Sequence, residues 1–169
     1  MSFVQPCPIP AGAALHAYSI PGTYTDCYSV TIPGNITQAE FITAFYTTAV
    51  FKLERFLLAT LASRPSTDSD AANLASGQSN HFAAWSVEHR SVSQLLLAAG
   101  PTRSWLMASP DVDRLASETT LYFGSAVVPT RTDHNGPATI AWPFHALLGF
   151  HKLYSRTLLC SAASKLRRT

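Results

Sequence analysis

The sequence predicts an α+β fold in which a curved antiparallel sheet wraps a long C-terminal helix, with a second long helix after the first strand. An apolar stripe with helical spacing runs through residues 38–62, and four strand-like runs follow between residues 81 and 128. A second helical stripe closes the chain at 142–166. Strands grouped between two helices favour an antiparallel sheet with helices packed on one side.

The composition is that of one globular domain with apolar surface to spare. The 169 residues suit a single domain, and 47% of them are hydrophobic. Only 13% are charged, about half the ordinary share of roughly 25%. The chain can therefore bury a large core and still line a ligand cavity or an oligomer interface. A net charge of +2 is too small to indicate a nucleic-acid partner.

No sequence signal directs the chain away from the cytoplasm. No apolar stretch reaches the roughly 18 residues of a membrane span. The N-terminus lacks the basic start and apolar core of a signal peptide. Cys7, Cys27 and Cys160 lie far apart without a C-x-x-C spacing, which predicts free thiols. We therefore expect a cytoplasmic protein that binds neither nucleic acid nor membranes.

The chain begins with an arm and a first strand. Residues 1–22, rich in proline, alanine and glycine, predict an extended N-terminal arm with a short edge strand at 14–20. A single domain then follows at 23–169. Its β-branched and aromatic residues at 24–32 predict the first strand, which ends at a turn over 33–35.

A capping box marks the start of the first long helix. Thr37 is followed three residues later by Glu40, directly before an apolar run. The helix is expected over 38–62, and its wide stripe indicates burial on more than one side. Pro65 ends the helix, and the polar residues 63–80 predict a loop.

The second half of the chain predicts an antiparallel meander and a closing helix. The strands are expected at 81–90, 93–98, 103–108 and 119–128, with loops at 109–118 and 129–141. The closing helix starts at Trp142. Its apolar stripe contains Phe144, Leu147, Leu148, His151, Tyr154, Leu158 and Ala162.

This order of elements, over about residues 24–166, resembles the helix-grip fold of the START, polyketide-cyclase and birch-pollen-allergen superfamily. The segments 84–90, 104–106 and 121–128 also look like a group of bacterial proteins of unknown function. The resemblance implies a hydrophobic cavity between the sheet and the last helix. The chain departs from the family in having one long helix in place of two short ones, and four later strands in place of six. A cystatin-like cone is the competing layout, but the second long helix does not suit it.

His151 and Tyr154 are the candidate catalytic residues. They lie three residues apart, so they are neighbours on one helix face. In a helix-grip layout that face lines the cavity, where a histidine could exchange protons near neutral pH and a tyrosine could donate a hydrogen bond. The alternative is a core histidine bonded to a backbone carbonyl.

The strand at 81–90 offers two interpretations, depending on which face points inward. If the face of Trp85 points inward, His89 shares the cavity, and Glu88 and Arg90 form a surface pair. If the other face points inward, the two charges are buried and functional, because unpaired buried charge is costly. We favour the Trp85 face.

The later strands add three candidate ligand contacts. Arg103 and Trp105 share a strand face, and the guanidinium could bind a carboxylate or phosphate at the cavity mouth. The alternative is an arginine at a strand end that reaches into solvent. Tyr122 could supply a cavity hydroxyl, and Gly124 on the same face leaves room for a ligand or a close backbone.

The other polar residues give weaker indications of a functional site. Ser125 lacks the G-x-S-x-G elbow and is not expected to be a nucleophile. Asp26 is a lone carboxylate, interpreted as a turn or cap residue. The scattered His81, His134 and His145 do not indicate a metal site, and no motif indicates a cofactor.

Together these patterns predict a protein that binds a small hydrophobic or aromatic, polyketide-like molecule in an internal cavity. If it is an enzyme, we expect cofactor-free acid–base chemistry of the cyclase, dehydratase or isomerase type. The alternative is a non-catalytic interaction protein or homodimer that uses the apolar surface of the first helix.

Overall fold

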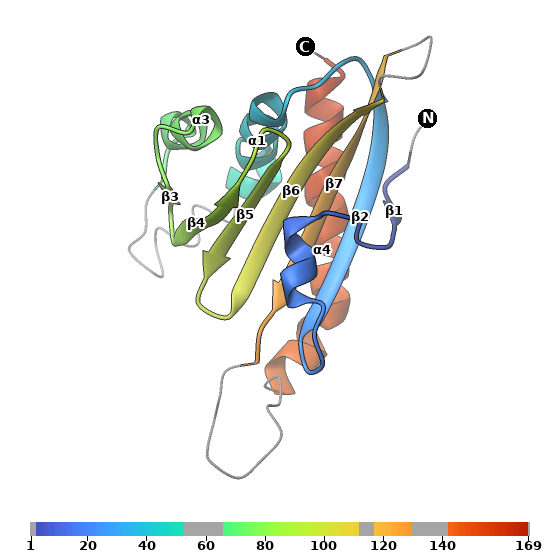
Figure 1. Cartoon of the computed structure of the whole chain (residues 1–169), viewed down its shortest axis with the longest axis vertical. Helices are drawn as coiled ribbons and strands as arrows, with labels where there is room; N and C mark the ends of the chain where they lie inside the picture. The colour runs from blue at the N-terminus through green and yellow to red at the C-terminus, as the bar shows by residue number, and fades with distance from the viewer. Residues whose placement is uncertain (1–2, 53–65, 112–116, 130–141, 169) are drawn as a thin grey trace.

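The α+β fold is confirmed. A computed structural model describes residues 3–52, 66–111, 117–129 and 142–168, and only the backbone of 142–150. Its core is a curved, unclosed sheet of seven antiparallel strands with the helices α1 (Gln38–Tyr46) and α4 (Trp142–Leu166) on one side (Figure 1). The strands are β1 (Gln5–Pro6), β2 (Tyr24–Pro33), β3 (His81–Phe82), β4 (Trp85–Arg90), β5 (Gln94–Ala99), β6 (Thr102–Asp111) and β7 (Glu118–Val127). The other helical elements are η1 (Ala14–Tyr18) and α3 (Asp68–Ser76).

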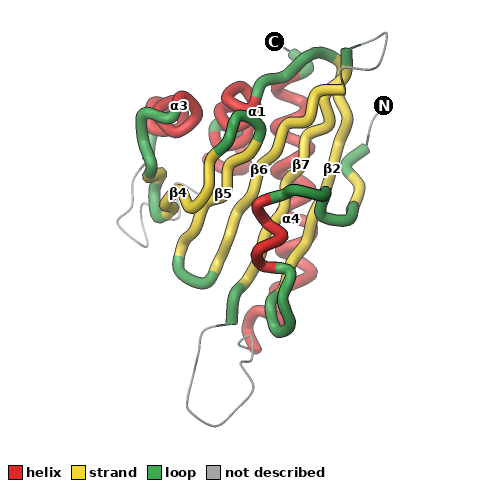
Figure 2. Tube along the Cα trace, in the orientation of Figure 1, coloured by secondary structure: helices red, strands yellow, loops and turns green. Residues whose placement is uncertain are grey.

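The sheet order is β1-β2-β7-β6-β5-β4-β3. The first long strand, β2, therefore pairs with the last one, β7, although about ninety residues separate them in the chain. Helices α1 and α4 lie behind the sheet in Figure 1, while the short blue helix η1 lies in front of it. Figure 2 shows the same division, with η1 in front of the strands and α1 and α4 behind them. We call the face toward α1 and α4 the inner face and the face toward η1 the outer face.

The N-terminal arm differs from the prediction. The expected edge strand at 14–20 is instead η1, and the strand of the arm is β1, which pairs with β2. Leu15 of η1 is fully buried against the outer face. Proline at positions 6, 8 and 10 disfavours a long strand there, because proline donates no ladder hydrogen bond.

The predicted helix over 38–62 begins as expected but is interrupted. The Thr37–Glu40 capping box is present, and α1 ends at Tyr46. Thr48 then starts a new helical turn, because its Oγ accepts a hydrogen bond from the Phe51 amide at 3.1 Å. Lys165 of α4 donates to the Thr47 carbonyl and hydroxyl, so the break is held by the closing helix. Residues 53–62 of the prediction lie outside the described residues.

The loop predicted over 63–80 contains a helix, α3. A second capping box, Thr67 with Asp70, starts it. Gly77 ends it in the left-handed conformation (φ +81°). The sequence did not predict α3, because the segment is mostly polar and shows no apolar stripe. Only Ala71 and Leu74 of α3 are buried.

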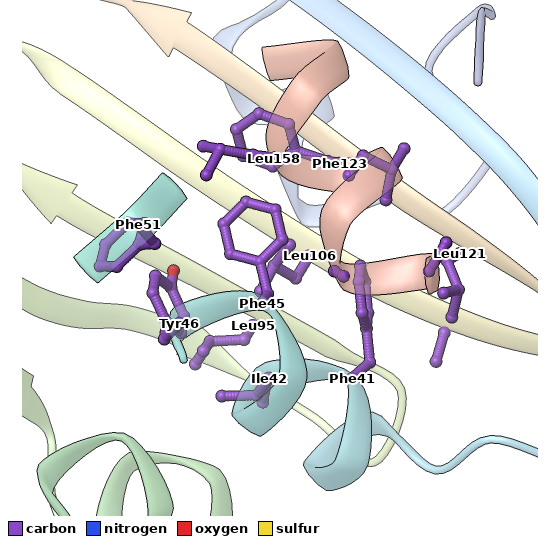
Figure 3. Packing of buried hydrophobic residues seen from close by; sticks show 14 of the residues in the cluster. Phe41, Ile42, Phe45, Tyr46, Phe51, Leu95, Leu106, Leu121, Phe123 and Leu158 are labelled. Atoms are coloured by element: carbon purple, nitrogen blue, oxygen red, sulfur yellow. The ribbon is translucent and has the colours of Figure 1, made fainter. Parts of the chain in front are cut away.

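Two apolar clusters lie on the two faces of the sheet. The larger cluster, on the inner face, joins α1, α4 and the strands, and Figure 3 shows Phe45 at its centre beside Phe123 and Leu158. The ring centroids of Phe45 and Phe123 are 4.9 Å apart. The smaller cluster, on the outer face, packs Leu15 of η1 against Trp105. Each face is thus covered by its own elements.

Gly124 sets how closely η1 approaches the sheet. A Cβ atom there would lie 2.5 Å from Leu15 Cδ2 and 2.9 Å from the Asp26 carbonyl oxygen. The close approach that the sequence suggested is therefore made by η1 and not by a ligand.

We expect Gly124→Ala to destabilise the protein by about 1–3 kcal/mol, because the methyl group overpacks this contact. Urea unfolding measures the change. The same substitution is also made in a Leu15→Ala variant, which lacks the clashing side chain. There Gly124→Ala should destabilise the protein less. Equal stability of Gly124→Ala and the parent protein would contradict the close packing.

Candidate functional site

A polar cluster of three side chains lies on the inner face, where α4 crosses β2 and β7. Asp26 and Ser125 are directly opposite each other in the β2–β7 pair, and His151 reaches them from α4. The Ser125 hydroxyl donates to Asp26 Oδ1 at 2.6 Å, and its amide donates to the same oxygen at 3.2 Å. His151 Nε2 lies 2.9 Å from Ser125 Oγ and 3.4 Å from Asp26 Oδ2.

The carboxyl group of Asp26 is held in its ionised form. Its side chain is 9% exposed, and burial alone would raise its pKa. The hydrogen bonds from His151, Ser125 and Tyr24, with the charge of His151, outweigh burial and hold the pKa of Asp26 below its usual range. Tyr24 donates to Asp26 Oδ2 at 3.1 Å. Burial and the Asp26 carboxylate raise the pKa of Tyr24, so this hydroxyl keeps its proton.

The hydrogen-bond directions fix which nitrogen of His151 carries the proton. An ionised carboxylate only accepts, and Ser125 already gives its hydroxyl proton to Asp26. Nε2 of His151 must therefore be the donor toward Ser125 Oγ and Asp26 Oδ2. In the neutral ring Nδ1 is then the basic nitrogen.

This arrangement differs from the triad of serine hydrolases. In that triad the serine and the carboxylate use opposite nitrogens of the histidine, so the histidine can take the serine proton. Here both partners meet Nε2, and the proton of Ser125 points at Asp26. Ser125 therefore orients Asp26 and His151 and is not an activated nucleophile, as the sequence also indicated.

The cluster borders a cavity of about 260 Å³ between α4 and the sheet. Ser125 and His151 supply part of its polar wall, and the His151 side chain is 28% exposed. Most of the other lining side chains are apolar. Besides Ser125 and His151, the cavity is lined by the aromatic Phe45, Phe51, Trp85 and Phe123, the aliphatic Ala126, Val127 and Leu158, and the polar Thr102, Arg103, Ser104, Tyr154 and Ser155.

Ser155 is an unusual part of this wall. It lies four residues after His151 on α4, so the two side chains share a helix face. It is fully buried, and its hydroxyl has no hydrogen-bond partner among the residues that the structure describes. A buried hydroxyl without a partner costs about 1–3 kcal/mol, which a bound molecule could recover by accepting a hydrogen bond.

Four of the predicted site residues, His151, Tyr154, Trp85 and Arg103, line the cavity. His151 and Tyr154 do so from α4, and Trp85 does so from β4, where it packs against the inner-face cluster. The side chain of His89 does not lie on the same face of the sheet as Trp85. A β-bulge between Val87 and His89 pairs His89 with Leu96, a residue of the outer-face cluster.

The bulge also separates the two charges predicted to pair on this strand. Arg90 donates to the carbonyl oxygens of Leu74 and Ser79 at the end of α3. Glu88 instead accepts from Arg103, with 2.7 Å between Oε2 and Nε. The alternation that the sequence suggested ends at the bulge, so a surface pair of Glu88 with Arg90 is not formed.

Arg103, Trp105 and Tyr122 make their side-chain contacts on the outer face. Arg103 is among the lining residues, but its guanidinium lies 4.8 Å above the ring of Tyr18 in η1 and contacts Glu88. Trp105 is fully buried in the outer-face cluster, where its Nε1 donates to Gln94 Oε1 at 2.9 Å. Tyr122 packs against Trp105 on that face. The structure therefore separates Trp105 and Tyr122 from His151 by the thickness of the sheet.

Sequence reasoning missed Asp26 as a site residue and assigned it to a turn. The signal was present in part, since Asp26 falls in phase with Tyr28, Val30 and Ile32, all of which point into the inner-face core. A carboxylate in phase with a buried strand face needs polar partners. Those partners come from β7 and α4, about one hundred residues later, and no local pattern identifies them.

Comparison with known proteins found no matching family model, no matching curated protein and no matching solved structure. Among the described residues no helix has the length and hydropathy needed to cross a membrane. The same part of the chain holds no group of three or more His, Cys, Asp and Glu side chains that could ligate a metal ion.

The lowered pKa of Asp26 predicts how stability depends on pH. Because the folded-state pKa lies below the unfolded value, the ionised carboxylate stabilises the fold above the unfolded pKa, near 4. That contribution is lost as the pH falls through the folded-state value.

We expect Asp26→Asn to lower the free energy of unfolding by about 1–3 kcal/mol at pH 7, because it weakens charge-assisted hydrogen bonds. The difference in the free energy of unfolding between Asp26→Asn and the parent protein should become smaller towards pH 3. Urea unfolding at both pH values measures it, with Asp68→Asn on the surface as the control. An unchanged difference at low pH would show that Asp26 does not titrate as described.

Proposed function

We propose that the protein binds a small, mostly apolar molecule in the cavity beneath α4 and that His151, supported by Asp26, transfers a proton to or from it without a cofactor. The observation that carries the proposal is the pairing of the buried Asp26 carboxylate with the partly exposed His151 at the edge of a mostly apolar cavity. A buried carboxylate that positions a titratable side chain beside a cavity is typical of functional sites.

The cavity volume supports a compact ligand. A cavity of roughly 150 Å³ lined by apolar side chains can hold benzene, so about 260 Å³ suits a somewhat larger molecule of one or two rings. This favours small aromatic compounds over the extended polycyclic polyketides. Phe45, Phe51 and Trp85 would contact the ring faces.

The proton chemistry follows from the hydrogen-bond directions in the cluster. Nε2 of His151 donates toward Ser125 and Asp26, so Nδ1 of the neutral ring is the atom that would take the proton. Ser155 and Tyr154, which both line the cavity from α4, would orient a carbonyl or hydroxyl oxygen of the ligand. Removal of a C–H proton beside that oxygen is the first step of isomerase, dehydratase and cyclase reactions.

The fold supports the helix-grip resemblance as the family context of this proposal. The first long strand pairs with the last, and the closing helix contacts both. The sequence departed from the helix-grip family in having one long first helix and too few later strands, and both departures are smaller in the structure. The first helix is broken at Thr47–Thr48, and β3 and β4 are separate strands. We infer from this that the chain is a divergent helix-grip protein.

The alternative of an interaction protein or homodimer stays a prediction. It was motivated by the wide apolar stripe of the first helix. The described apolar residues at its centre, Phe41, Ile42 and Phe45, are buried in the chain's own core. That stripe therefore supports folding of the monomer more directly than association.

The first experiment is native mass spectrometry of protein purified under native conditions, with thermal shifts for phenol, 2-naphthol, indole, benzoate and octanoate. A co-purified small molecule, or stabilisation by one of the aromatic probes, supports the proposal. An empty protein that none of the probes stabilises, and that forms a tight dimer by gel filtration, favours the interaction protein.

We expect Ser104→Phe to abolish the thermal shift given by an aromatic probe. Ser104 lies on the inner face opposite Ser125, and a phenyl group there would fill the cavity. Ser104→Ala is the matched control and should keep the shift. Retained binding by a folded Ser104→Phe variant would place the ligand elsewhere.

We expect the parent protein to catalyse exchange of the acidic C–H protons of a small aromatic ketone such as 2-tetralone in D₂O. Proton NMR follows the exchange. His151→Gln keeps a donor near Asp26 but cannot take up a proton, so the rate should fall by about 10²–10⁴-fold. Tyr154→Phe should reduce it less, and equal rates for the parent and His151→Gln would exclude His151 as the base.

A further inference from the structure

Two cysteines face each other at the edge of the sheet, outside the proposed site. The register of β1 with β2 pairs Gln5 with Ser29 and Pro6 with Tyr28. The next residues in this register are Cys7 and Cys27, and the Cys7 amide donates to the Cys27 carbonyl at 3.0 Å. Their sulfur atoms are 3.5 Å apart. The sequence did not predict this contact, because the two cysteines are twenty residues apart in the chain.

The backbone geometry of this pair suits a disulfide. Directly opposed residues in a hydrogen-bonded antiparallel pair have Cα atoms about 5.5 Å apart. Disulfides bridge Cα separations of roughly 4.4–6.8 Å. The two thiols already touch, so a bond between them requires side-chain rotation and not a rearrangement of the strands.

The two thiols differ in their access to solvent. Cys27 is buried in the outer-face cluster, while Cys7 is half-buried at the margin of that cluster. Burial and the neighbouring Cys7 raise the pKa of the Cys27 thiol, which makes Cys27 the slower of the two to react with a dissolved oxidant. Cys160 is exposed on α4 and takes no part in this pair.

We propose that Cys7 and Cys27 form an oxidation site, at which a peroxide converts the two thiols into a disulfide that ties the N-terminal arm to β2. The proposal does not rest on the proposed function, because the pair lies on the outer face and the cavity on the inner face.

The reaction balances with one peroxide per pair. The Cys7 sulfur attacks one oxygen of hydrogen peroxide, the O–O bond breaks, and a sulfenic acid and water are formed. The Cys27 sulfur then attacks the sulfenic sulfur. The S–O bond breaks, the S–S bond forms, and the Cys27 proton leaves with the hydroxyl group as a second water.

Closure of this bond would enclose η1 in a covalent loop. Residues 8–26 lie between the cysteines and contain Leu15, which packs at Gly124, and Tyr18, which contacts Arg103. A cross-link over a loop of this length restricts the unfolded chain. For a chain of this size the melting temperature should rise by roughly 5–10 °C.

The test treats the reduced full-length protein with hydrogen peroxide and then blocks the remaining thiols. Intact mass spectrometry should show the loss of two hydrogen atoms, and peptide mapping without reductant should identify a Cys7–Cys27 cross-link. The melting temperature should rise, and dithiothreitol should reverse it. Cys160→Ser is the control and should behave like the parent.

Cys7→Ser removes the half-buried partner and should neither form the cross-link nor gain stability. Because Cys27→Ser alters a buried position, Cys27→Ala serves as the second variant, and both are first confirmed as folded by circular dichroism. Stepwise addition of oxygen atoms at Cys7 without a cross-link would overturn the proposal. A cross-link through Cys160 between two chains, with Cys7 and Cys27 still reduced, would overturn it as well.

Discussion

The pairing of β2 with β7 is the interaction on which the rest of the structure depends. Ten residue pairs join the two strands, from Tyr24 with Val127 to Pro33 with Glu118. This pairing joins the start of the domain to its end, so it is formed against the entropy of closing a long loop. It also sets Asp26 opposite Ser125, and α4 contacts both of these strands. A shift of one residue between the two strands would place Asp26 and Ser125 on opposite faces of the sheet.

The two faces of the sheet are covered by different means. The inner face is packed by the aromatic residues of α1 and by α4, which together leave the cavity. The outer face is covered by η1, whose Leu15 packs at Gly124 and whose Tyr18 contacts Arg103 and Glu88. This second cover explains why Trp105 is buried without contacting the cavity. An aromatic residue in a strand indicates burial, but it does not tell which layer buries it.

Local patterns predicted the elements well and their partners poorly. Strands β2, β5, β6 and β7 and helix α4 lie within one or two residues of their predicted bounds, except for the C-terminal end of β6, because each depends on nearby periodicity and turn residues. The bulge at Glu88 reversed the face of His89, and the break at Thr47 depends on Lys165 of α4. His151, Tyr154 and Trp85 could be predicted as cavity residues from helix and strand phase. Asp26 could not, because its partners come from distant strands and helices.

Strand β2 bears two kinds of chemistry on opposite sides of one backbone. Asp26 points inward to His151, and the next residue, Cys27, points outward to Cys7. Alternation makes this possible, since neighbouring residues of a strand face opposite ways. The same arrangement couples the two sides mechanically. A change in the position of β2 that separated the cysteines would also move the carboxylate that holds His151, because rigid peptide units join the two residues. The N-terminal arm pairs with β2 at the edge of the sheet, and Val4 of the arm packs against the inner-face cluster, so the arm supports the geometry of the candidate site from that edge.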